Sequence, residues 1–226
     1  MQNAGVRTSI TISGDLIGHC RTLYELSLTQ ALTGKVLRHG INAFSPHALP
    51  AYVVAVASIE AFISESLLSS LTLTICKTSP LHELKTEWID KLELKQRLLV
   101  STKLLFDWSL KKDAQPYQDF DLLVKIRNDI THYKNDGVLP KYIVPMKDRN
   151  IFMKHPGNFH NPWASDVSCT EGIIWAHNTA CEVVIEIIKN APKDVAEVIA
   201  WNSQNFTPIP SGSSKLFFES HGIKIE

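Results

Sequence analysis

The sequence predicts an all-α fold, because apolar residues recur at helical spacing in four long segments. These segments are residues 46–74, 84–108, 116–134 and 171–190. Two of them begin with a proline, which is common in the first turn of a helix. We therefore expect a helical bundle with a proline-rich loop inserted before its last core helix.

The first half of the chain is expected to contribute three helices. Asp15 can cap an amphipathic segment that reaches about residue 38. Residues 46–74 follow as a central helix, and residues 84–108 are rich in good helix formers. The central segment carries Glu60 and Glu65, so it lacks the run of about 18 apolar residues that marks a membrane span. We expect it to be buried within the protein, with no membrane contact.

The second half is divided by turn-forming residues. A helix over residues 116–134 should end at Asn135-Asp136-Gly137, because this sequence is a strong helix stop. Four prolines interrupt the next stretch, so residues 137–168 are expected to form a loop, with a short extended piece at 142–144. Helical spacing returns over residues 171–190, which predicts a fourth core helix.

The chain is expected to form one main domain. It has 226 residues, 44% of them hydrophobic, which suffices for one core of ordinary size. We assign residues 1–205 to this domain, with helices over 170–203. Residues 206–226 are expected to form a C-terminal tail, because they are rich in Ser, Pro and Gly.

Composition narrows the classes of partner and cofactor. The 23 basic and 23 acidic side chains balance, so any contact with RNA must be local rather than driven by a long-range field. The four cysteines form no Cys-x-x-Cys pair, and no His/Cys/Asp spacing suggests a metal site. We expect no metal, no cofactor and a reducing cytoplasm, since no segment resembles a secretory signal.

A helical wheel over residues 120–133 separates two faces. One arc is apolar and should face the core; it contains Leu122, Leu123, Ile126, Ile130 and Tyr133. Asn128 and His132 lie together on the opposite face, with Arg127 beside it. Phe120 and Val124 also fall outside the core arc, so a second helix or a second subunit is expected to cover that side.

Arg127, Asn128 and His132 together suit cleavage of RNA by its own 2′-hydroxyl. An imidazole can exchange protons near neutral pH, whereas a guanidinium fork binds the nonbridging phosphate oxygens. Asn128 can orient the imidazole or donate to phosphate. The spacing alone is weak, because Arg149-Asn150 followed by His155 has a similar form within the proline-rich loop. From the helix wheel alone, a solvated arginine and a helix-capping histidine explain Arg127 and His132 better than an active site does.

Residues 51–134 resemble the HEPN superfamily, the higher eukaryotes and prokaryotes nucleotide-binding domains. Residues 58–65 resemble an early helix of that family, with Glu60-Ala61-Phe62 and a second acid. Residues 88–105 resemble its next helix. Residues 126–133 match its Arg-polar-x(3 to 5)-His motif, including Asn directly after Arg. The family-like core would span about residues 46–136.

The resemblance implies a metal-independent endoribonuclease, of the kind found in toxins and anti-phage defence effectors. Two copies would meet through the motif helix, and each active site would combine Arg127 and His132 from both chains. An antitoxin or another partner protein is also implied. In some toxins of this family a partner nucleotidyltransferase modifies a tyrosine in His-x-Tyr, but Lys134 occupies that place here.

The candidate catalytic residues are therefore Arg127, His132 and Asn128. Glu60, Tyr133 and Thr131 are supporting residues, and Glu60 is expected to form an ion pair or hydrogen bond that orients Arg127 or a backbone amide. Two alternatives remain. Instead of a ribonuclease, the chain would be a non-catalytic HEPN module that binds RNA, nucleotide or a protein partner, or a structural helical adaptor.

Overall fold

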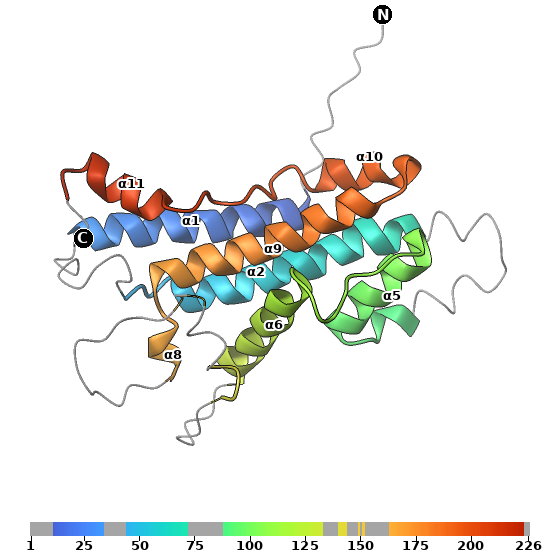
Figure 1. Cartoon of the computed structure of the whole chain (residues 1–226), viewed down its shortest axis with the longest axis horizontal. Coiled ribbons are helices and arrows are strands. Elements are labelled where there is room, and N and C mark those ends of the chain that lie inside the picture. Colours follow the sequence, from blue (N-terminus) through green and yellow to red (C-terminus); the bar gives the residue numbers. More distant parts are fainter. Residues whose placement is uncertain are drawn as a thin grey trace, which may run out of the picture.

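The computed structural model describes residues 11–33, 44–71, 88–132, 140–143, 149, 151 and 163–223. Within them the fold is all-α, as predicted, and the only β-type pairing is an isolated bridge between Phe44 and Cys169 (Figure 1). Three long helices lie side by side at the centre. They are α1 (Ile12–Thr33), α2 (Ala48–Phe62) and α9 (Thr170–Asn190), and the π-helical segment η2 (Ile63–Leu68) prolongs α2.

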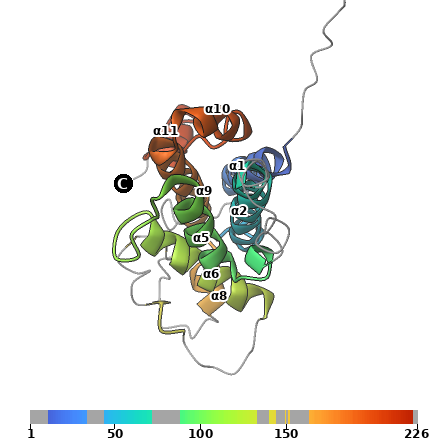
Figure 2. The same ribbon diagram turned by 90° about the vertical axis from the view of Figure 1, so that its right-hand side faces the viewer.

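Shorter helices cover this centre from two sides. On one side lie α5 (Leu94–Phe106), α6 (Tyr117–Thr131) and α8 (Trp163–Asp166). On the other side lie α10 (Lys193–Asn202) and α11 (Ser213–Ser220), as the end-on view shows (Figure 2). Helix α6 crosses both α2 and α9, so its own residues are held by two central helices.

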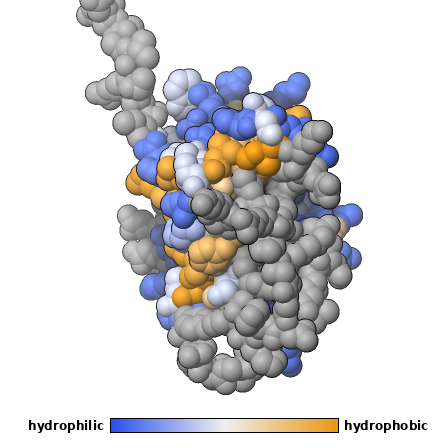
Figure 3. Space-filling view, turned by 90° about the vertical axis from the view of Figure 1, so that its left-hand side faces the viewer, coloured by the Kyte–Doolittle hydropathy of each residue, from blue (hydrophilic) through white to orange (hydrophobic). Residues whose placement is uncertain are grey.

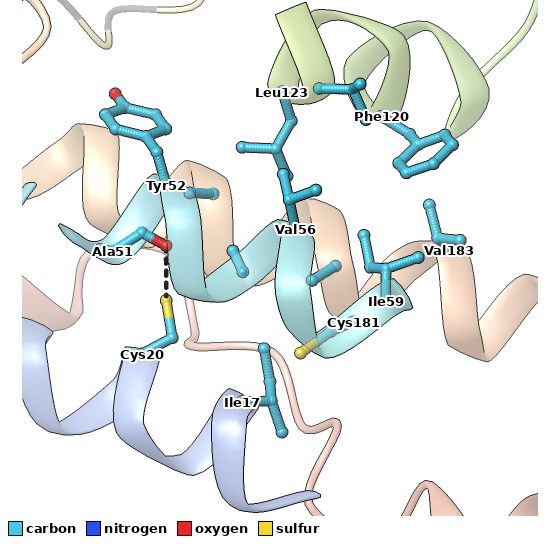
Figure 4. Packing of buried hydrophobic residues seen from close by; sticks show 14 of the residues in the cluster. Ile17, Cys20, Ala51, Tyr52, Val56, Ile59, Phe120, Leu123, Cys181 and Val183 are labelled. Atoms are coloured by element: carbon cyan, nitrogen blue, oxygen red, sulfur yellow. Dashed lines mark hydrogen bonds between the residues drawn. The ribbon is translucent and has the colours of Figure 1, made fainter. Parts of the chain in front are cut away.

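The central helix is buried as the sequence predicts. Its stretch Ala48–Leu71 is long and apolar enough to cross a membrane, yet 61% of its apolar 18-residue window is buried inside the protein. Tyr52, Ile59 and Phe62 have no exposed surface. Figure 4 shows this helix between α1 and α6, with the Cys20 thiol donating to the Ala51 carbonyl. This burial is what a core helix requires.

Glu65 explains where the first helix begins. Its carboxylate accepts hydrogen bonds from the Ile12 amide (2.8 Å), the Ser13 amide (3.1 Å) and the Ser13 hydroxyl (2.6 Å). A carboxylate at a helix N-terminus satisfies amides that have no partner within the helix. Helix α1 therefore starts at Ile12, three residues before the predicted cap at Asp15, and Asp15 lies in its first turn.

The helix predicted over residues 84–108 is shorter than expected. Helix α5 begins at Leu94 because the backbone of Glu93 is extended (ψ 148°), and residues 88–90 form a separate helical turn. The Arg97 guanidinium donates to the carbonyl oxygens of Asp90 (2.9 Å) and Leu92 (3.4 Å). These bonds stabilise the break, and periodicity along the chain could not have indicated it.

Two other helices match their predicted positions closely. Helix α6 follows Pro116 and ends at Thr131, and α9 begins one residue before the predicted start at 171.

The prediction of an extended piece at 142–144 is wrong for its described part. Residues 141 and 142 lie in a turn, and the Ile143 amide donates to the Pro140 carbonyl (3.0 Å). Residue 144 lies outside the described residues.

The side of α6 that carries Phe120 and Val124 is covered by helices of the same chain, so it is not free for a second subunit. Phe120 is fully buried and Val124 is 4% exposed. Figure 4 shows Phe120 near Ile59 of α2 and Val183 of α9. A helical wheel places these residues outside the core because it assumes one neighbouring helix, whereas α6 contacts two.

Residues 206–223 pack against the central helices rather than trailing from them. The Asn178 side chain donates to the Ile209 carbonyl (2.8 Å) and accepts from its amide (2.7 Å). Phe218 of α11 is 1% exposed, and the Ser214 and Tyr24 hydroxyls are hydrogen-bonded (3.3 Å). Figure 3, viewed from the end where α11 lies, shows apolar and hydrophilic side chains intermixed on this surface.

His177 should make the fold sensitive to acid. It is fully buried, its Nε2 lies 3.0 Å from the Thr207 carbonyl oxygen, and its Nδ1 has no hydrogen-bond partner among the described residues. Burial lowers the pKa of His177 below the value of about 6.5 expected in the unfolded chain. The unfolded chain then binds the extra proton, so this contribution to stability is present above about pH 6.5 and is lost as the pH falls.

The test is urea unfolding of the wild type and the His177→Gln variant at pH 7.5 and pH 5.5. We expect the free energy of unfolding to fall more in the wild type than in the variant. Other titrating groups are the same in both proteins and cancel in this comparison. An equal fall in the two proteins would show that His177 is not the acid-sensitive group.

Candidate functional site

The three predicted catalytic residues occupy the end of α6. Asn128 is exposed, Arg127 is half-buried, and His132 is the exposed C-terminal cap residue of the helix. The His132 amide donates to the Asn128 carbonyl (2.9 Å). This bond holds the backbone of His132 at the end of the helix, and its side chain is exposed to solvent.

A pocket of about 370 Å³ is lined by residues of α2, α5 and α6. It is lined by Glu60, Leu92, Glu93, Leu94, Lys95, Arg97, Val124, Arg127 and Asn128. Three of the predicted site residues, namely Glu60, Arg127 and Asn128, thus meet in one place although they come from two helices. His132 and Thr131 are not among the lining residues.

Two arginines in this pocket have unused hydrogen-bond donors. The Nε atoms of Arg127 and Arg97 are both buried and have no hydrogen-bond partner among the described residues. An unsatisfied buried N–H costs about 1–3 kcal/mol, and more when the group is charged. Both arginines line the pocket, and a guanidinium fork fits an anion with several acceptor oxygens, phosphate in particular.

Glu60 forms an ion pair, but with an arginine that the sequence did not suggest. Its carboxylate lies 3.8 Å from Nη1 of Arg97, and its side chain is 44% exposed. No hydrogen bond or ion pair within the described part of the chain links it to Arg127. An ion pair this long, with a partly exposed carboxylate, contributes little to stability.

Lys95 of α5 adds a positive charge beside α6. Its ammonium lies 2.7 Å from one oxygen of Asp121, and the Lys125 ammonium lies 2.6 Å from the other. Burial opposes ionisation of Asp121, but the hydrogen bonds from both lysines outweigh it and lower the pKa of this carboxyl group. The hydrogen bond to Asp121 raises the pKa of Lys95. Asp121 and Lys95 are therefore both charged at neutral pH.

The remaining predicted residues have other surroundings. The Thr131 hydroxyl donates to the carbonyl oxygens of Arg127 and Asn128, both at 3.0 Å, so it completes the helix end. Tyr133 lies outside the described residues. In the second Arg-Asn-His stretch, Arg149 is bound to Asp119 (2.6 Å), whereas Asn150 and His155 lie outside the described residues.

The described part of the chain contains no group of three or more His, Cys, Asp or Glu side chains that could hold a metal ion. Cys20, Cys169 and Cys181 are buried and unpaired, and Cys76 lies outside the described residues. Burial raises the pKa of each of the three thiols to about 12. A protonated, buried thiol is a poor nucleophile, so these cysteines serve the core.

Arg97 is the residue that sequence reasoning missed. It lies one residue before Leu98, which is fully buried, and its side chain is only 15% exposed. An arginine so close to the buried stripe of a helix is a signal that a sequence can provide.

Comparison with known proteins adds no further guide: no protein-family model, curated protein or solved structure matches this chain.

Proposed function

We propose that this chain is a metal-independent endoribonuclease of HEPN type and acts as a toxin or anti-phage defence effector. The observation that carries the proposal is the pair of buried, unpaired Nε donors of Arg97 and Arg127. Both arginines line one pocket together with Asn128, and Arg127 and Asn128 belong to the helix that ends at the exposed His132. An RNA phosphodiester supplies the acceptors that these donors lack.

The reaction needs two proton transfers and stabilisation of negative charge. The 2′-hydroxyl attacks the adjacent phosphorus, and the bond from phosphorus to the 5′-oxygen breaks, giving a 2′,3′-cyclic phosphate and a 5′-hydroxyl. Arg127 and Arg97 donate to the nonbridging oxygens, whose charge grows in the transition state. His132 removes the 2′ proton or protonates the leaving 5′-oxygen, and Asn128 donates to the phosphate.

Two chains are proposed to form each active site. His132 does not line the pocket that contains Arg127, so a second copy that meets the first along the exposed edge of α6 would bring another imidazole to it. The face for this contact includes the exposed Asn128 and His132 rather than the buried Phe120 and Val124.

A non-catalytic module that binds RNA or nucleotide is the second candidate. The observation in its favour is the same separation of His132 from the pocket, since a phosphate can bind to the arginines without any proton transfer. RNA binding without cleavage by the wild-type protein would support this candidate over the first.

The Arg127→Gln variant tests the pocket directly. We expect its RNA cleavage rate to fall by about 10²–10³-fold, the loss found when one donor to a developing oxyanion is removed. The matched control is Arg21→Gln on α1, which makes the same charge change away from the pocket, where the Arg21 guanidinium donates to the Thr207 carbonyl (2.6 Å). Single-turnover cleavage of a labelled RNA at fixed ionic strength gives both rates. Equal rates in the two variants would rule out this pocket as the active site.

A further inference from the structure

A second and larger pocket lies on a neighbouring face of α6. Its volume is about 570 Å³, within the range of about 300–1,000 Å³ typical of small-molecule sites. Lys125, Lys141 and Arg149 supply positive charge, whereas Leu122 and Tyr142 supply apolar surface. Cations beside an aromatic and an aliphatic wall are the combination that a nucleotide requires, because its phosphate is anionic and its base has two apolar faces.

The walls of this second pocket are fixed by carboxylates of α6. Asp119 accepts hydrogen bonds from Nε of Arg149 (2.6 Å) and from the indole of Trp175 (3.3 Å). Asp129 accepts one from the Tyr142 hydroxyl (2.6 Å). The surroundings of Arg149 and Tyr142 are thus set in the absence of a ligand, which reduces the entropy cost of binding.

The Tyr142 ring is held from a second direction as well. It makes an edge-to-face contact with Trp163, with ring centroids 6.2 Å apart and planes at 89°. A ring fixed in this way can form a stacking surface without losing further freedom. Burial, followed by the hydrogen bond to Asp129, raises the pKa of Tyr142, so its hydroxyl stays protonated.

Asp121 joins the two pockets. It lines the second pocket, and its carboxylate binds Lys95 of the first pocket on one oxygen and Lys125 of the second on the other. The pockets therefore flank one ridge of α6.

We propose that the second pocket binds a nucleotide of the same RNA strand whose scissile phosphate occupies the first pocket. Lys125 and Lys141 bind its phosphate, and Tyr142 and Leu122 contact its base. The strand crosses α6 over Asp121. This inference rests on the proposed function, since it needs an RNA strand at Arg127.

RNA binding measured over a range of salt concentrations tests the proposal. The protein is the full chain with His132→Ala, so that a 12-nucleotide RNA stays intact. For a single strand, the slope of log K against log salt falls by about 0.7 for each phosphate that the protein no longer neutralises. We expect the double variant Lys125→Gln/Lys141→Gln to lower the slope by about 1.4. The matched control is Lys103→Gln/Lys112→Gln, which removes two exposed lysines from a different surface and should leave the slope unchanged.

The arms of the experiment separate this proposal from the proposed function. If Arg127→Gln weakens RNA binding but the Lys125/Lys141 variant behaves like its control, the second pocket is not on the RNA path and only the first pocket stands. If the His132→Ala protein binds no RNA, both proposals fail. If a free mononucleotide binds as tightly as the RNA and is lost in the Lys125/Lys141 variant, the pocket is a site for free nucleotide and the RNA path is overturned.

Discussion

Replacing His132 with alanine should lower the rate of RNA cleavage by about 10²–10⁴-fold, the range associated with one general acid or base. The loss should leave the fold intact, because the side chain is exposed and its imidazole forms no hydrogen bond or ion pair with the described residues of the core. The free energy of unfolding should therefore stay within about 0.5 kcal/mol of the wild type.

The chain provides a close control for this variant. His221 is also an exposed histidine at the C-terminal cap of a helix, but it ends α11, on the side of the bundle away from α6. The His221→Ala variant removes the same side chain from the same kind of position and should cleave RNA at the wild-type rate. Equal cleavage by both alanine variants would remove His132 from the mechanism.

Replacing Phe120 with alanine should reduce the free energy of unfolding by about 3–5 kcal/mol. Phe120 is fully buried against α2 and α9, and its removal leaves a cavity where three helices meet. Leu216→Ala is the control, because Leu216 is 66% exposed and should change stability by no more than about 0.5 kcal/mol. Urea unfolding followed by circular dichroism measures both.

This variant also distinguishes a core position of Phe120 from a position at a dimer interface. Truncating a core residue destabilises the chain equally at every protein concentration. A residue at a dimer interface would instead make the unfolding midpoint of the variant depend on concentration differently from that of the wild type. The second outcome would contradict the packing of α6 against α2 and α9.

The sequence predicted the helices where local signals are strong. Helix α6 lies between Pro116 and the turn sequence from residue 135, and α9 has an uninterrupted apolar period, so their positions were predicted within a few residues. The predicted start of α5 was wrong, because the chain breaks at Glu93 and the Arg97 side chain, which belongs to the helix itself, stabilises this break. Such a contact has no signature in hydrophobic periodicity.

In the candidate site, too, the features set within one helix were predictable and those set by packing between helices were not. The positions of Asn128 and His132 relative to each other follow from one helix, and both side chains are exposed. The partner of Glu60 could not be predicted, because no spacing relates α2 to α5 along the chain. The pocket between these helices, and with it the role proposed for Arg97, depends on how the helices pack in three dimensions.

The products of RNA treated with the wild-type protein in the presence of EDTA test the central claim most directly. Mass spectrometry of the fragments identifies their end groups, and a substrate with a 2′-deoxy sugar at the cleaved position serves as the control. We expect 2′,3′-cyclic phosphate and 5′-hydroxyl ends from RNA, and no cleavage at the 2′-deoxy position. Absence of cleavage, cleavage that requires added metal, or cutting at the 2′-deoxy position would contradict attack by the 2′-hydroxyl at the Arg127 pocket.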